Sequence, residues 1–185
     1  MDPTHIGETF LALTRYRFAV PSDQHLGRPA PALHRRHPQV GEDIPLPPVP
    51  RVPGDFQELT EARESTRRYA ARPLSLDELS WLLWATQGVK EVHRSGVCTF
   101  RTVPSAGSRH PFETYLGIQR VEGLDPGLYQ YAPLTHALMP VTASSDLAGR
   151  LAAACLGQSM LETCAASFLW TAVPGRTTWR YGQRG

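Results

Sequence analysis

Three short segments of the sequence combine residue types that could bind an anionic or planar ligand. In the first, Arg63 and Arg67 are four residues apart and Ser65 lies between them. Guanidinium groups match phosphate oxygens bidentately, and a serine hydroxyl adds a neutral donor. The spacing indicates a phosphate-binding cluster, and the alternative is a solvated domain edge, where arginines are common.

The second segment has small residues between two prolines, Pro104 and Pro111. Ser105, Ala106 and Gly107 would let a ligand approach the backbone closely and meet its free N–H groups. The same residues suit a tight turn before a strand, and composition alone favours the turn.

The third segment is the end of the sequence, where Arg180, Tyr181 and Arg184 could meet an anionic or planar ligand. The alternative is a frayed chain end. His34 and His37 have a spacing that would suit a metal ion. The chain around them is rich in proline and offers no further ligand nearby, so we predict no metal site.

A buried helix is predicted between the first and second segments. Ser75 to Glu78 matches the capping-box pattern that begins a helix, and Gly88 is a typical end. Its leucines form one face, while Trp81 and Trp84 make the other sides apolar. We therefore expect this helix to be buried on nearly all sides.

The remaining elements predict an α+β domain that begins near Phe56 and extends to residue 185. A helix is expected from Ser145 to about Cys155, and a second capping-box match begins another at Ser159. Strands are expected at three places, with a turn at 125–127 between the first two: Thr114 to Val121, Leu128 to Tyr131, and Ala166 to Val173.

Residues 1–55 precede this domain as a helix-like segment, Thr4 to Tyr16, and a proline-dense stretch, Val20 to Pro53. Proline removes the N–H groups that regular structure needs, so the stretch should be extended. Two interpretations remain open. The stretch is a disordered linker, or it is an ordered arm wrapped over the domain or over a dimer partner.

Charge and cysteine content restrict the class of protein. The chain has 185 residues and a formal net charge of +2 of mixed sign, which is not typical of a nucleic-acid binder. Cys98, Cys155 and Cys164 have no metal-type spacing and suit a reducing compartment. The start lacks a secretory pattern, and no apolar run approaches ~20 residues. We expect a soluble cytoplasmic protein that binds neither nucleic acid nor membrane.

Taken in order, these segments resemble the nitroreductase superfamily. Arg-x-Ser-x-Arg-x-Tyr at 63–69, followed by 73–88, is similar to the opening of such a domain. Arg-Thr-Val-Pro-Ser-Ala-Gly at 101–107, followed by Gly-Leu-Tyr-Gln-Tyr at 127–131, is similar to the SagB-type dehydrogenase branch. That branch includes azoline oxidases, which convert thiazolines and oxazolines of modified peptides to thiazoles and oxazoles. The arm with Ile44 to Pro47 also resembles this branch.

The resemblance implies a nitroreductase-like α+β fold and a homodimer that holds FMN at the subunit interface. By this likeness, the FMN phosphate and ribityl chain would be bound by Arg63, Ser65 and Arg67. The flavin ring would lie against Pro104, Ser105, Ala106 and Gly107. Electron transfer would belong to the flavin, which the protein positions and tunes.

The same likeness implies a catalytic pair at Arg180 and Tyr181, where azoline-oxidising relatives carry Lys-Tyr. Arginine has a pKa above about 12 and is a poor proton shuttle where lysine could serve. The implied substrate is a peptide azoline or a small electron-poor molecule.

Relatives also continue beyond the motif at 180–185, so we expect only the front half of the fold: a fragment, a truncated reading frame or half of a split enzyme. The alternative function is a non-catalytic remnant or partner-binding module without flavin. A third hypothesis is a structural module that docks through Pro45 to Pro53 into aromatic-lined grooves.

Overall fold

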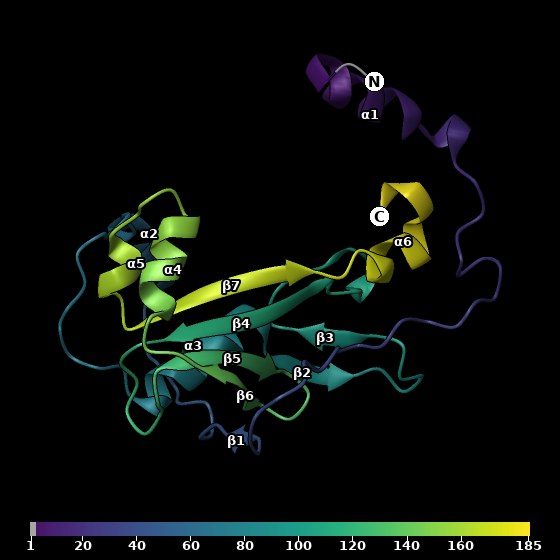
Figure 1. The fold of residues 1–185 in the computed structure, drawn as a ribbon. Coiled ribbons are helices and arrows are strands. Elements are labelled where there is room, and N and C mark those ends of the chain that lie inside the picture. The colour runs from purple at the N-terminus through teal and green to yellow at the C-terminus, as the bar shows by residue number, and fades with distance from the viewer. Residues whose placement is uncertain (1–2) are drawn as a thin grey trace.

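The computed structural model describes residues 3–185. Within this range the centre of the molecule is a five-stranded antiparallel sheet in the order β1-β6-β5-β4-β7 (Figure 1). A separate hairpin pairs β2 with β3. The strands are β1 (Ile44–Pro45), β2 (Val89–Val92), β3 (Thr99–Arg101), β4 (Phe112–Ile118), β5 (Gly127–Ala132), β6 (Ala137–Ala143) and β7 (Ala166–Ala172).

Six α-helices of the described residues surround the sheet unevenly. Figure 1 shows α2, α4 and α5 together at one end of the sheet, α6 at the other end, and α1 standing apart from the sheet. The helices are α1 (Ile6–Leu13), α2 (Phe56–Ala62), α3 (Leu76–Gln87), α4 (Leu147–Ala154), α5 (Met160–Thr163) and α6 (Gly175–Tyr181). Short 3-10 turns are η1 (Pro3–His5), η2 (Tyr16–Phe18), η3 (Ala106–Ser108) and η4 (Gly182–Arg184). Helices combined with an antiparallel sheet confirm the predicted α+β class.

The hydrophobic core lies between α3 and one face of the sheet. Leu79 and Leu83 of α3 are fully buried against Leu116 of β4 and Leu138 of β6. Alternate strand residues point to opposite faces, so Leu116 and Ile118 face α3 while Gly117 faces the other side. There α4 lies close, because a Cβ on Gly117 would be 2.8 Å from Leu151 Cδ1.

The helix α3 begins and ends where the sequence predicts. The Ser75 hydroxyl accepts from the Glu78 N–H at 3.1 Å, and the Glu78 carboxylate accepts from the Ser75 N–H at 2.9 Å. The expected burial on nearly all sides is wrong, because Leu82 is exposed and Trp81 and Trp84 are only half-buried. Only one face of α3 packs on the sheet.

The other predicted elements have mixed outcomes. The strands expected near 114–121, 128–131 and 166–173 are confirmed as β4, β5 and β7, and the helix expected from Ser145 is confirmed as α4. The expected cap at Ser159 is wrong. Ser159 makes no capping bond, because its backbone is already helical (φ −61°, ψ −21°), whereas a capping residue needs extended backbone. The N-terminal helix is present as α1, and none of its residues is buried.

The proline-dense stretch is an ordered arm that crosses both faces of the sheet. Gln130, on the face opposite α3, accepts from the His37 N–H and donates to the Arg35 carbonyl, both at 2.7 Å. The arm then pairs with β6 through β1, and the Ser80 hydroxyl of α3 donates to the Pro47 carbonyl at 2.8 Å. These contacts favour the ordered-arm interpretation over the disordered linker. Among the described helices, none combines the length and apolar character needed to cross a membrane.

Candidate functional site

Two of the three predicted ligand-binding segments meet in the structure. Gly107, in η3, lies directly beneath Arg180 and Tyr181 at the end of α6. A Cβ on Gly107 would lie 2.5 Å from Arg180 Nε and 2.7 Å from Tyr181 Oη. Its φ of +56° is also in the left-handed region that favours glycine. This position therefore requires glycine for both backbone and space.

The loop that carries Gly107 is held in a strained form by its own side chains. The Ser105 hydroxyl accepts from the His110 N–H at 2.9 Å, which closes the turn. Ser108 and His110 both have positive φ, at 54° and 42°. Non-glycine residues rarely adopt such angles, and they persist where the surroundings fix them, often at functional sites.

Beneath this loop, a buried ion pair joins four parts of the chain. Arg176 of α6 is 1 % exposed and its guanidinium bonds the carboxylate of Glu113 in β4. It also donates to the His110 carbonyl at 3.1 Å and to the Ala32 carbonyl at 2.9 Å. Glu113 additionally faces His34 Nδ1 at 2.8 Å and accepts from the Arg35 N–H at 2.7 Å. The loop, β4, α6 and the arm are thus fixed relative to one another.

Burial and hydrogen bonding change the pKa values of this network in opposite ways. Burial alone would raise the pKa of Glu113, but bonds from His34, the Arg35 N–H and Arg176 outweigh it and lower the pKa. Burial, followed by the nearby Arg101 charge, lowers the pKa of His110 to about 4. His110 is therefore neutral at pH 7 beside a carboxylate that stays ionised.

Two further buried arginines bind the arm through its carbonyl groups. Arg109 donates to the Arg176 carbonyl at 3.0 Å, lies 4.7 Å from the centre of the Trp179 ring, and places Nη2 3.5 Å from the Pro31 carbonyl. Arg101 donates to Gln87 at 3.0 Å and places Nη2 3.5 Å from the Leu33 carbonyl.

Burial is the main cause that lowers the pKa of both Arg101 and Arg109, to about 10 for Arg101. Together with Arg176, these side chains meet the carbonyl groups of three successive arm residues, 31, 32 and 33.

Sequence reasoning missed this network. Glu113, inside an otherwise apolar strand, was the available signal, because a buried carboxylate needs a cationic partner.

Two cavities lie on either side of the Ala106 backbone. The smaller, of about 240 Å³, is lined by Pro104, Ser105 and Ala106 together with His110 and Phe112.

The larger cavity, of about 700 Å³, separates Arg180, Tyr181 and Arg184 from the N-terminal part of the chain. On that side its walls are Tyr16, Ala19, Val20, Pro21 and His25. The predicted flavin-facing loop therefore borders open space on both sides.

The first predicted segment lies elsewhere. Arg63, Ser65 and Arg67 follow α2 in an exposed stretch, where Arg67 Nη1 approaches the Ser65 carbonyl at 3.4 Å. Figure 1 places α2 with α4 and α5, at the end of the sheet away from α6. Within one chain, the structure does not bring this segment to the loop at 104–107 or to Arg180.

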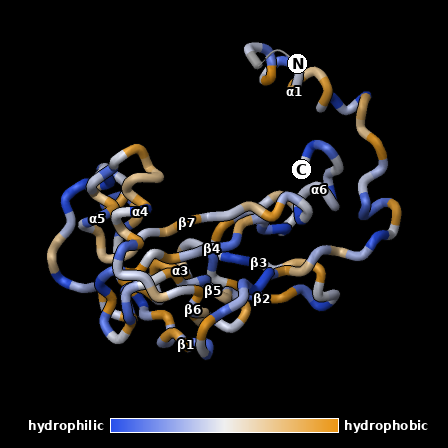
Figure 2. The backbone as a smooth tube through the Cα atoms, in the orientation of Figure 1, coloured by the Kyte–Doolittle hydropathy of each residue, from blue (hydrophilic) through white to orange (hydrophobic). Residues whose placement is uncertain are grey.

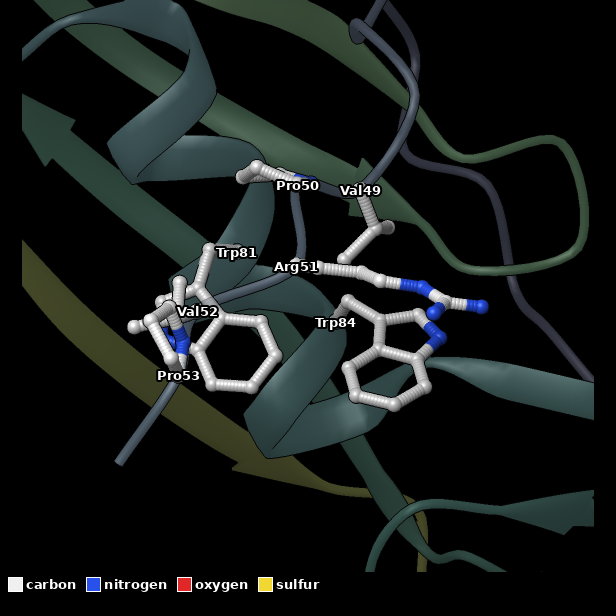
Figure 3. Close-up of a pocket in the computed structure, with 7 residues that line it drawn as sticks. All are labelled: Val49, Pro50, Arg51, Val52, Pro53, Trp81 and Trp84. Atoms are coloured by element: carbon white, nitrogen blue, oxygen red, sulfur yellow. The ribbon is translucent and has the colours of Figure 1, made fainter. Parts of the chain in front are cut away.

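A third cavity, of about 640 Å³, lies on the outer side of α3 (Figure 3). Trp81 and Trp84 form one wall with ring centres 5.6 Å apart, and Val49 to Pro53 form the other. It contains none of the predicted site residues, and Arg51 is the one charged side chain among its described lining residues. The lining of this cavity therefore offers few groups for chemistry.

The two histidines with metal-compatible spacing have other partners. His34 Nδ1 faces Glu113, and His37 Nδ1 lies 2.7 Å from the Pro38 carbonyl. Among residues 3–185, no group of three or more His, Cys, Asp or Glu side chains is arranged to hold a metal ion.

Comparison with known proteins gives a consistent result. The model of the nitroreductase family matches residues 60–185. A Methanocaldococcus jannaschii protein named as a nitroreductase is 33% identical over 143 residues, which cover 77% of this chain and 68% of that protein.

A solved structure named as a nitroreductase from Ralstonia eutropha is 27% identical, with a TM-score of 0.57, over 89% of this chain and 70% of that one. Another, from Anabaena variabilis, is 25% identical, with a TM-score of 0.63, over all of this chain. This chain spans 32% of the length of the Anabaena protein. The region matched by the family model contains all three segments whose residue types indicate ligand binding. The chain belongs to the nitroreductase family.

Proposed function

We propose that this chain acts as an FMN-dependent oxidoreductase of the SagB type, with its site at the loop 104–107 and the pair Arg180–Tyr181. The observation that carries the proposal is the position of Gly107, which can only be glycine and lies under both members of the pair. The cavities beside Ala106 leave room for a planar ring and for a substrate.

The residues present fit a flavin nucleotide. When bound, FMN supplies the redox chemistry by accepting electrons and passing them on. Pro104 to Gly107 are small residues, so their backbone can lie close to the ring. Arg63, Ser65 and Arg67 make no side-chain bond to a carboxylate among the described residues, so their donors remain available to a phosphate.

A homodimer would reconcile the separation of these two groups within one chain. We infer that the arginine segment of one copy meets the loop 104–107 of another. The exposed edge of the sheet supports this, because β7 pairs with β4 on one side only and leaves Trp170 about half exposed. Native proteins usually cover such an edge.

For the pair itself, the two side chains have different capabilities. Arg180 carries a guanidinium, which can hold charge in place and is a poor proton shuttle. The Tyr181 hydroxyl can donate and accept, and the acid–base role falls to it. The proposed substrates are a peptide azoline, which would be oxidised, or a small electron-poor molecule, which would be reduced. The free thiols of Cys98, Cys155 and Cys164 support a cytoplasmic location.

The test is flavin binding to the purified protein, measured by fluorescence titration with FMN. Gly107→Val should abolish binding while the far-UV circular dichroism stays unchanged. Gly157→Val is the matched control, because Gly157 also has positive φ but has nothing within 4 Å of its Cβ position. It introduces backbone strain without blocking the site, so it should bind FMN like the parent protein. A folded Gly107→Val protein with unchanged FMN affinity would contradict the proposal.

A second experiment tests the residues proposed to bind the FMN phosphate. Arg67→Ala should raise the FMN Kd by roughly 10- to 150-fold, as for the loss of one charge-assisted bond, and Arg63→Ala by less. Arg150→Ala, an exposed arginine on α4, is the control. A folded parent protein that binds no FMN would favour the alternative, a partner-binding module without flavin.

A further inference from the structure

The two walls of the larger cavity beside the loop are joined by contacts of neighbouring residues. Ser22 is buried, the Gln24 N–H donates to the Trp179 carbonyl, and the Trp179 indole N–H donates to the Arg28 carbonyl, both at 2.9 Å. These bonds attach the N-terminal part of the chain to α6. The two walls are thus fixed to each other, and the space between them is a built feature of the fold.

The charged side chains of this cavity are all of one kind. Arg180 and Arg184 line it, His25 faces them from the other wall, and no Asp or Glu is among the described lining residues. Neither arginine makes a salt bridge or a side-chain hydrogen bond within residues 3–185. Figure 2 shows that the C-terminal end of the chain, beside α6, is hydrophilic. Unpaired guanidinium groups that share a cavity attract an anion.

Arg180 is also held in position. Its stem covers Gly107, as the short distances to a hypothetical Cβ show, and its guanidinium carbon lies 5.7 Å from the centre of the Tyr181 ring. An ordered guanidinium loses less conformational entropy when it binds an anion than a freely moving one. His25 is ordered too, because its Nδ1 lies 2.9 Å from the Ser22 hydroxyl, which leaves Nε2 for a ligand.

The rest of the cavity surface is apolar. Ala19, Val20 and Pro21 on one wall and Ala106 on the other can cover the hydrocarbon part of a molecule. A volume of about 700 Å³ is within the range of small-molecule sites. A ligand that matches both features has an apolar or planar body and one anionic group.

We propose that this cavity is the substrate subsite of the oxidoreductase, and that it selects substrates with a carboxylate or phosphate group, which Arg180 and Arg184 bind. The inference rests on the proposed function and names its substrate class. The same chemistry could come from the phosphate of FMN, and the experiment separates the two sources.

The first measurement uses benzoate as the probe, benzamide as its neutral counterpart, and isothermal titration calorimetry. Benzoate should bind the parent protein, and benzamide should bind at least about 10-fold more weakly. Arg184→Gln and Arg180→Gln should each weaken benzoate binding by about 5- to 20-fold, and Arg184→Lys by less. Arg150→Gln, an exposed arginine on α4, should change nothing. Equal affinity for benzoate and benzamide would overturn the proposal.

The second measurement compares FMN with riboflavin, which has the same ring and no phosphate. In Arg184→Gln, both flavins should bind as they bind the parent protein. If FMN alone were weakened, the cavity would hold the cofactor phosphate, and the substrate assignment would be overturned. If the parent protein bound neither flavin but still bound benzoate through Arg184, the anion site would stand while the proposed oxidoreductase function failed.

Discussion

Two irregular segments of this chain differ in how they are held. Residues 31–47 and residues 63–71 both contain little regular structure, and each has a pair of adjacent arginines. The first segment is bound by side chains of the sheet, α3 and α6. The second makes few bonds: Arg67 approaches the Ser65 carbonyl, and Arg120 Nη2 lies 3.5 Å from the Ala70 carbonyl.

The difference arises from partners elsewhere in the chain. Proline lacks an N–H group but keeps its carbonyl, so a proline-rich arm has more backbone acceptors than donors. Arg109, Arg176 and Arg101 are buried and need acceptors, and the carbonyls of residues 31–33 meet them. The arm is ordered because its carbonyls and these buried donors satisfy each other. Arg120, which approaches the Ala70 carbonyl, is only half-buried and has less need of that acceptor.

The largest effect is expected from Glu113→Ala. This change leaves the Arg176 guanidinium buried without its carboxylate and removes the acceptor of the Arg35 N–H. Breaking one side of a buried pair costs about 3–5 kcal/mol of unfolding free energy. Urea denaturation measures it, with Glu162→Ala on the exposed side of α5 as control. A loss below about 1 kcal/mol would mean that the arm does not depend on this pair.

The next effect is a pH dependence that His110 confers. Burial and Arg101 lower its folded-state pKa from 6.5 to about 4, so the unfolded chain takes up the proton first as the pH falls. The contribution of neutral His110 to the free energy of unfolding is fully present above about pH 6.5. It is lost as the pH falls to about 4, and the loss is at most about 3 kcal/mol.

Asparagine tolerates the positive φ at this position. His110→Asn should therefore reduce the change in the urea midpoint between pH 6.5 and 4. His5→Asn, at an exposed site, should leave the slope unchanged. Equal slopes in all three proteins would show that His110 titrates normally.

A smaller effect is expected at the second attachment point of the arm. Ser80 donates to the Pro47 carbonyl, and its oxygen lies 2.8 Å from His136 Nε2. Ser80→Ala removes the partner of these half-buried groups, which costs about 1–3 kcal/mol. Ser159→Ala, at the position where no cap forms, should change the unfolding free energy by less than about 0.5 kcal/mol. Similar changes in unfolding free energy for the two variants would show that Ser80 does not anchor the arm.

The smallest effect on stability is expected in the exposed segment. Arg67→Ala should stay within about 0.5 kcal/mol of the parent protein, because its side chain has no buried contact. Limited trypsin digestion should cut after Arg67 and Arg68 roughly 10-fold faster than after Arg35 and Arg36. Faster cleavage in the arm would reverse the comparison.

The sequence predicts those parts of the fold whose signals are local. The capping box at Ser75 and Glu78 lies within one turn, and apolar runs mark β4 and β7, so these elements are confirmed. The pattern at Ser159 is equally local but fails, because α5 has only four residues and no extended residue before it.

The site shows the corresponding limit. Residue types indicated the loop 104–107 and the pair Arg180–Tyr181 separately, yet their meeting depends on how β7 and α6 return along β4. The bond between Arg176 and Glu113 joins residues 63 apart, and no local pattern encodes such a partner. Trp81 and Trp84 are less buried than their apolar character predicts, because apolar character does not specify how many neighbours a helix has.

The bond from Arg176 to the Ala32 carbonyl also has a consequence for synthesis of the chain. Its two residues are 144 apart, so the arm leaves the ribosome long before the arginine that binds it exists. At about 5–20 residues per second, the delay is roughly 7 to 30 s. During that time the Ala32 carbonyl lacks this partner. The arm is therefore expected to attach late in folding, after β4 and α6 have formed, as is usual for contacts between distant residues.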